Sequence, residues 1–157
     1  MAQLKETNDI VYKIIGACME VHRVVGPGYP VEFYKRALEI EFKEKELTVE
    51  NDKSFDIIYK DVLIGNYVID FWVNDKVIVV VRSQEDLSDG EIQQVLRGLG
   101  LADTKIGLLV NFGQAKMQYR RIVPSRQTRD AKEGRKENKR HVNYKPTGRT
   151  RETNPLY

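Results

Sequence analysis

Residues 67–82 read YVIDFWVNDKVIVVVR, and this stretch decides the fold class. Both halves are rich in β-branched and aromatic residues, and Asn74-Asp75 separates them at the distance of a hairpin turn. The second half is apolar at every position from 77 to 81, which predicts a central strand covered on both faces. A third β-rich run, residues 55–59, precedes them beyond the turn Lys60-Asp61. The middle of the chain therefore predicts a three-stranded meander.

The N-terminal part of the chain has a helical period. From residue 9 to 25 the apolar residues recur at spacings of three and four, and Gly26-Pro27-Gly28 ends the pattern. A second helix is expected from near Pro30 to Glu46, with its many charged residues, Lys35 among them, on a solvated face.

The meander is followed by a third helix and a second interior strand. Asp89 is expected to cap the helix, and residues 106–112 read as the strand. Residues 121–123 predict a short edge strand before Pro124. We therefore expect an α/β domain over residues 1–124, with a mixed sheet of four or five strands flanked by two N-terminal helices and one later helix.

Composition excludes several classes of protein. The 157 residues suffice for one domain, no apolar run is long enough to span a membrane, and the start lacks a signal-peptide pattern. These features predict a cytoplasmic protein without membrane contact. One cysteine and two histidines exclude an internal disulfide and a Cys/His zinc site, and Cys18 falls on the apolar face of the first helix as a core residue.

The last 33 residues differ from the rest of the chain. Residues 125–157 carry ten basic and four acidic side chains but only three aliphatic ones, so this tail is expected to be disordered unless a partner orders it. Such an arm is typical of proteins that follow a phosphate backbone, and RNA is favoured over DNA because long basic arms become ordered within folded RNA. The expected phosphate contacts are Arg126, Arg129, Arg135, Lys136, Lys139, Arg140, Arg149 and Arg151.

Short motifs in a fixed order give the chain a family resemblance. Glu20-Val21-His22, Gly26-Pro27-Gly28, Tyr34, Asp70 and Asn111-Phe112-Gly113 together resemble the GxxExxY family, a branch of the PD-(D/E)xK nuclease superfamily, over about residues 8–123. The resemblance implies a restriction-endonuclease-like fold. It also implies Mg²⁺-assisted phosphodiester cleavage by an aspartate on one strand and a Glu-x-Lys pair on the next.

The positions that would carry this chemistry depart from the family pattern. Asp70 matches the aspartate, but the glutamate and lysine positions hold Val80 and Arg82. Valine offers a metal no oxygen, and arginine stays protonated near neutral pH. Counting from Gly28, Val31 stands where the glycine-anchored motif of the family has a glutamate. Gln93 matches the glutamine of a Q-x-x-x-Y pattern, but Arg97 stands where that pattern has a tyrosine. We therefore expect no catalytic residue and no cofactor.

Three functions follow from these patterns. The leading hypothesis is an inactive nuclease-fold protein that binds RNA as a structural subunit of a larger assembly with other proteins, such as a ribosome. One alternative is an active Mg²⁺-dependent nuclease with a relocated site built from Glu20, Glu32, Asp70 and Arg82. The other alternative is a protein-interaction module, for instance a homodimer through an exposed strand or Trp72, with a tail that only solubilises.

Four local expectations concern individual side chains. Asp70 is expected to pair with Arg82, and His22 to cap carbonyls at the end of its helix. Trp72 is expected in the core. Residues 83–89 are expected to form a solvated acidic loop, which would repel phosphate.

Overall fold

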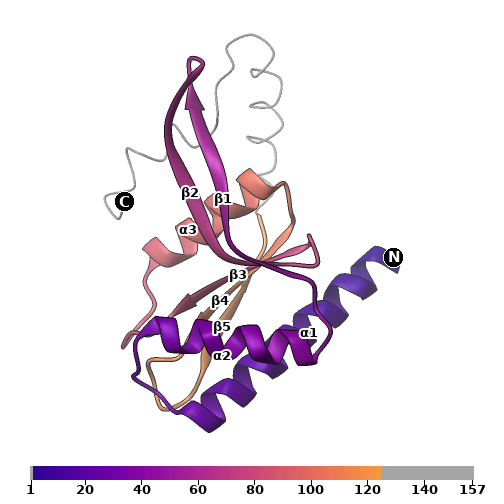
Figure 1. The fold of residues 1–157 in the computed structure, drawn as a ribbon, viewed down its shortest axis with the longest axis vertical. Coiled ribbons are helices and arrows are strands. Elements are labelled where there is room, and N and C mark those ends of the chain that lie inside the picture. Colours follow the sequence, from indigo (N-terminus) through magenta and orange to yellow (C-terminus); the bar gives the residue numbers. More distant parts are fainter. Residues whose placement is uncertain (1, 125–157) are drawn as a thin grey trace.

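The computed structural model describes residues 2–124, which form three helices and five strands (Figure 1). The elements follow one another as α1 (Ala2–Val25), α2 (Val31–Glu44), β1 (Val49–Tyr59), β2 (Val62–Val73), β3 (Val77–Arg82), α3 (Asp89–Ala102), β4 (Ile106–Asn111) and β5 (Gln118–Ile122).

The five strands form one mixed sheet in the order β1-β2-β3-β4-β5. Strands β3 and β4 are parallel and are joined through α3, whereas the other neighbours are antiparallel. Helices α1 and α2 lie on one face of the sheet and α3 lies on the other (Figure 1). The α/β architecture expected from the sequence is confirmed.

Strand β3 is the central strand that its apolar sequence predicts. Val77, Val79 and Val81 belong to the core shared with α1 and α2, whereas Ile78 and Val80 belong to the core beneath α3. Because successive side chains of a strand point to opposite faces, an unbroken apolar run satisfies both layers.

The predicted core positions of α1 are also buried. Cys18 is fully buried in the core shared by α1 and α2, as expected. Burial raises the pKa of its thiol to about 12, so the thiol stays protonated near neutral pH.

The sheet divides at Asp70. Strand β2 pairs with β3 only from Phe71 to Val73, while the rest of β2 continues with β1 as a two-stranded hairpin. Ile69 packs into the α3 core but Phe71 packs into the α1 and α2 core, so β2 changes the face it presents at Asp70. On β1, Asp52 has a φ of 50° and no ladder partner, which marks the same kink.

Several element boundaries differ from the sequence predictions. Helix α1 begins at Ala2, seven residues before the predicted start at Asp9, and Glu6 near its start forms a 3.1 Å ion pair with Lys76. Strands β1 and β2 begin at Val49 and Val62, earlier than predicted, because their added residues are polar or lie near a turn and carry no alternating pattern. Helix α2 ends at Glu44 rather than Glu46.

The predicted basic tail, residues 125–157, lies outside the described residues, and so do its eight expected phosphate contacts. None of the helices within residues 2–124 combines the length and apolar character needed to cross a bilayer.

Candidate functional site

Asp70 lies at the fork where β2 leaves β3. Its Oδ2 accepts a hydrogen bond of 2.8 Å from the backbone N–H of Val81, just beyond the last ladder pair, Phe71 and Val79. The carboxylate therefore satisfies a main-chain donor that the diverging strand no longer reaches.

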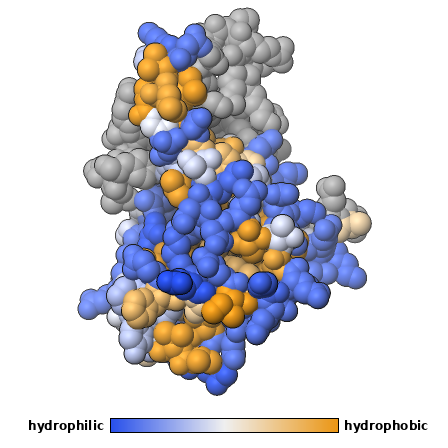
Figure 2. All heavy atoms as spheres, viewed as in Figure 1, coloured by the Kyte–Doolittle hydropathy of each residue, from blue (hydrophilic) through white to orange (hydrophobic). Residues whose placement is uncertain are grey.

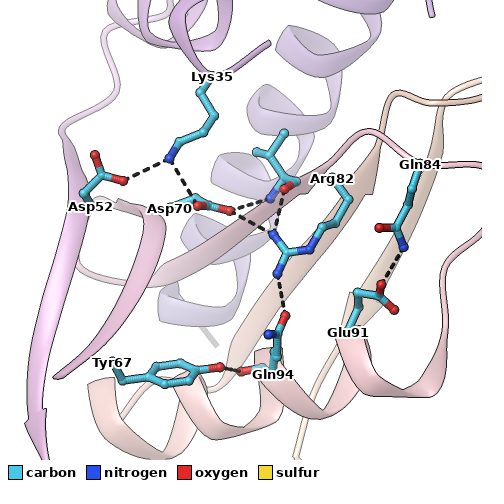
Figure 3. Close-up of polar contacts among 9 residues, drawn as sticks. Lys35, Asp52, Tyr67, Asp70, Arg82, Gln84, Glu91 and Gln94 are labelled. Carbon is cyan, nitrogen blue, oxygen red and sulfur yellow. Dashed lines mark hydrogen bonds and ion pairs between the residues drawn. The ribbon is translucent and has the colours of Figure 1, made fainter. Parts of the chain in front are cut away.

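Two cations flank this carboxylate (Figure 3). Lys35 Nζ lies 3.3 Å from Oδ1 of Asp70, and Arg82 Nη1 lies 3.6 Å from Oδ2. The Asp70 side chain is 20% exposed and those of Lys35 and Arg82 are 23% and 28% exposed, so these ion pairs are shielded from bulk water. The predicted pairing of Asp70 with Arg82 is confirmed, and each carboxylate oxygen faces a cation.

Lys35 was expected on a solvated face, and that prediction is wrong. Its ammonium reaches from α2 to Asp70 and also forms a 3.0 Å ion pair with Asp52 at the kink of β1. Burial disfavours the charged form, but the hydrogen bond with Asp52 and the negative charges of Asp70 and Asp52 outweigh burial and raise the pKa of Lys35. Lys35 is therefore a protonated cation and a poor general base.

Arg82 is held from two further sides. Its Nη1 donates a 2.8 Å hydrogen bond to the carbonyl of Val81, and its Nη2 donates to Oε1 of Gln94 on α3. Tyr67 from β2 donates a 2.8 Å hydrogen bond to the backbone carbonyl of Gln94 (Figure 3). The guanidinium thus links the fork to α3 in a fixed orientation.

With this geometry in place, comparisons with known proteins give the family. The family model described as PD-(D/E)XK nuclease superfamily matches residues 8–122. The chain belongs to this superfamily. No curated protein matches its sequence.

A solved structure shares this fold. The protein described as "Crystal structure of SSO0001" superposes with a TM-score of 0.51 at 15% identity and covers 68% of this chain. The match covers 55% of that protein, so this chain spans about half of its length. At this identity the likeness shows a shared fold.

Superfamily nucleases need carboxylates that converge on a metal ion, and the residues around Asp70 do not fit a divalent cation. Val80, at the expected glutamate position, is 7% exposed and packs into the α3 core, and Val31 packs against the core of α1 and α2. Within residues 2–124 no group of three or more His, Cys, Asp and Glu side chains is placed to hold a metal ion.

The relocated metal site proposed from the sequence does not form. Both carboxylate oxygens of Glu20 accept 2.9 Å hydrogen bonds from Arg23 one turn along α1, and Glu32 is exposed on α2. The hydrogen bond from Arg23 lowers the pKa of Glu20. Of the four residues, only Asp70 and Arg82 come together.

The glutamine that reaches the site is Gln94, not Gln93, whose side chain is exposed. The side chains of Gln93 and Gln94 point about 100° apart around α3, and the resemblance to the family pattern did not show which of them faces the site. Gly98 lies four residues after Gln94, on the same face of α3. A Cβ at Gly98 would lie 3.1 Å from Ile69, so this point of contact between α3 and the sheet leaves little room for a side chain.

Asn111 fixes the loop beside the site. It is fully buried, its Oδ1 accepts the backbone N–H groups of Gln84 and Gly113, and its Nδ2 donates to the Gln84 carbonyl and to Gln118. A Cβ at Gly113 would lie 2.0 Å from the Gln84 carbonyl oxygen, so only glycine allows this approach. These motif residues shape the loop.

The acidic loop itself is partly solvated, as expected. Glu85, Asp86 and Asp89 are exposed, but Gln84 turns inward and donates a 2.5 Å hydrogen bond to Glu91 on α3 (Figure 3). Burial disfavours the Glu91 carboxylate, yet hydrogen bonds from Ser88 and Gln84 outweigh burial and lower its pKa. Ser88 and Glu91 form a capping box, which places the N-cap at Ser88 rather than Asp89.

Three further residues named in the sequence analysis have structural roles. Tyr34 donates a 2.5 Å hydrogen bond to the carbonyl of Gly26 and fixes the turn after α1. His22 donates a 2.8 Å hydrogen bond from Nε2 to the backbone carbonyl of Gln114. The prediction that His22 caps carbonyls of its own helix is therefore wrong. Trp72 is half-buried rather than a core residue, and Lys53 Nζ lies 5.1 Å from its ring centre.

Proposed function

We propose that the chain is a GxxExxY-type member of the PD-(D/E)XK nuclease superfamily that binds nucleic acid without cleaving it. One observation carries the proposal: Lys35 and Arg82 occupy the two sides of the Asp70 carboxylate where a metal ion would have to bind. A divalent cation at that place would have to displace both cations from a shielded ion pair, and Val80 offers it no second carboxylate.

The protonation states of the neighbouring side chains agree with this proposal. Activation of water needs a group that gives up its proton near neutral pH. The raised pKa of Lys35 keeps that side chain charged, and the guanidinium of Arg82 stays protonated at any physiological pH. Neither replaces the lysine of an active superfamily member.

The nucleic-acid part of the proposal rests on the superfamily and on the sequence of the tail. Members of a nuclease superfamily act on nucleic acids, and ten basic side chains follow residue 124. We propose that they contact RNA phosphates, with Arg126, Arg129, Arg135, Lys136, Lys139, Arg140, Arg149 and Arg151 as the contacts, within an RNA-protein assembly such as a ribosome.

Cleavage assays test the proposed lack of activity. The full chain and the variant Asp70→Ala are incubated with single- and double-stranded RNA and DNA in Mg²⁺ or Mn²⁺. We expect the two proteins to show the same background with every substrate. Metal-dependent cleavage by the wild type that falls by orders of magnitude in Asp70→Ala would overturn the proposal.

A salt series tests the binding. Replacing the eight named basic residues by glutamine keeps the chain length and removes eight charges, so we expect weaker RNA binding and a smaller slope of log K against log salt. The control Lys43→Gln with Lys60→Gln removes two charges from the folded domain, on α2 and at the hairpin turn, and shows the effect per charge outside the tail. Equal binding by the wild type and the eightfold variant would contradict the proposed role of the tail.

A further inference from the structure

The β1–β2 hairpin extends well beyond the rest of the sheet. Past the fork, its ladder runs from the pair Lys53 and Ile69 to the pair Tyr59 and Val62. Among the described residues, β1 is the only strand that pairs with β2 between residues 62 and 70. The hairpin projects from the body (Figure 1). A two-stranded hairpin without support is only marginally stable in water.

Apolar side chains gather at the end of this hairpin. Val62, Leu63, Ile64 and Val68 are 60%, 55%, 47% and 56% exposed, and they form a cluster at the top of the molecule in Figure 2. These four residues lie within seven positions of the chain, and most other exposed large apolar residues lie on α1 and α2. A concentrated exposed apolar patch marks an interaction surface.

The two edges of the hairpin differ in charge. Strand β1 carries Glu50, Asp52, Lys53 and Asp56, which are the usual protection of an edge strand against pairing. Residues 62–69 of β2 read VLIGNYVI and contain neither charge nor proline. Residues 62–69 therefore lack charged protection. The ladder with β1 has a bulge here, because Ile57 pairs with Gly65 and Ile58 with Leu63, and another strand can pair with β2 on either side of that bulge.

We propose that this edge pairs with the same edge of a second copy of the chain, forming an antiparallel homodimer. Nucleic acid does not suit the segment, because residues 62–69 hold no cation to meet a phosphate. A charged protein strand would bring unmatched charges against apolar side chains. The segment matches itself, because no like charges meet in a two-fold pairing.

The sequence also gives the register. The exposed stretch 62–68 is centred on Gly65, and a two-fold axis there places Val62 opposite Val68 and Leu63 opposite Tyr67 of the other copy. Gly65 then faces its own counterpart. This pairing spans seven residues and is interrupted at the bulge of Ile64, so the interface lies at the small end of the specific range and the dimer dissociates on dilution.

Sedimentation of the full chain across a concentration series tests the dimer. We expect the wild type to change from monomer to dimer as concentration rises, and Ile64→Lys to shift the midpoint at least tenfold upward. Ile40→Lys is the matched control, because Ile40 is 63% exposed on α2, away from the hairpin. A wild type that stays monomeric throughout would overturn the proposal and assign the patch to another part of the chain or to another protein.

Oxidative cross-linking tests the register independently of affinity. A Cβ at Gly65 meets no atom within 4 Å, so Gly65→Cys should fold, and the native Cys18 is buried and unreactive. We expect Gly65→Cys to form a disulfide-linked dimer, and the control Gly100→Cys on α3, where a Cβ is equally unhindered, not to do so. Equal cross-linking by both variants would overturn the pairing, whereas loss of RNA binding alone would concern only the proposed function.

Discussion

The base and the end of the β1–β2 hairpin differ in how their side chains are satisfied. At the base, the Asp70 carboxylate is held by Lys35, Arg82 and the N–H of Val81, all from the same chain. At the end, Val62 and Leu63 are more than half exposed, with no strand but β1 beside them in the described part of the chain. The comparison teaches that the chain neutralises its own shielded charge at the base of the hairpin, whereas at the end of the hairpin it leaves apolar side chains exposed.

Removing the carboxylate at the base should have the largest effect. We expect Asp70→Ala to lower the free energy of unfolding by about 3 kcal/mol, because two shielded cations and one main-chain donor lose their common partner. Chemical denaturation measures the change. The control is Asp56→Ala, whose carboxylate accepts an exposed hydrogen bond from Asn66 and should contribute less than about 0.5 kcal/mol.

The sign of this effect also separates two kinds of site. In a metal site without its ion, carboxylates repel one another, so removal of one of them stabilises the fold. An Asp70→Ala variant more stable than the wild type would therefore contradict the closed site.

Removing one of the two cations should have a smaller effect. We expect Lys35→Met to lower the free energy of unfolding by about 1 kcal/mol, because Arg82 and Val81 still hold Asp70 while the apolar stem of residue 35 is kept. Denaturation of Lys35→Met beside Lys43→Met, an exposed lysine of the same helix, measures the difference. Equal stability of the two variants would show that Lys35 does not act at the base.

The capping box of α3 should respond to acid. The lowered pKa of Glu91 means that its carboxylate stabilises the fold above the ordinary value of 4.5, and this contribution is lost as the pH falls through the native pKa. We expect Glu91→Gln to lower stability by about 0.5–1 kcal/mol at pH 7, because the amide can still close the capping box but lacks the negative charge at the N-terminus of α3. The variant should converge with the wild type in acid. A constant difference from pH 7 to pH 3 would contradict this assignment.

The end of the hairpin should have the smallest effect on the stability of one chain. We expect Ile64→Lys to change the free energy of unfolding of the dilute protein by less than about 0.5 kcal/mol, since the side chain is already 47% exposed. The measurement is denaturation far below the dimer midpoint. A loss above about 2 kcal/mol would mean that Ile64 packs within its own chain.

Much of the fold followed from local pattern. The unbroken apolar run at residues 77–81 predicted the central strand, and the three-four spacing before Gly26 predicted α1. The ends of β1 and β2 did not follow, because pairing between two long strands depends on main-chain hydrogen bonds that carry no residue pattern.

The site was predictable where a single strand pair decided it. Asp70 and Arg82 stand on adjacent strands joined by a three-residue turn, so their pairing could be expected. Lys35 and Gln94 were missed because each belongs to a helix that reaches the fork only through packing, and one residue along a helix turns a side chain by about 100°. The mixed charges of α2 around Lys35 gave no signal of an inward lysine.

The sequence by itself determined the order of the elements, their buried faces and the absence of charge along residues 62–69, since these depend on neighbours in the chain. Only the tertiary structure decided that Lys35 joins Arg82 at Asp70 and that β2 leaves the sheet there. Both features depend on tertiary packing, because they require α2 to lie against the point where β1 and β2 kink. Ion pairs form between residues that are close in space, and sequence distance does not limit them.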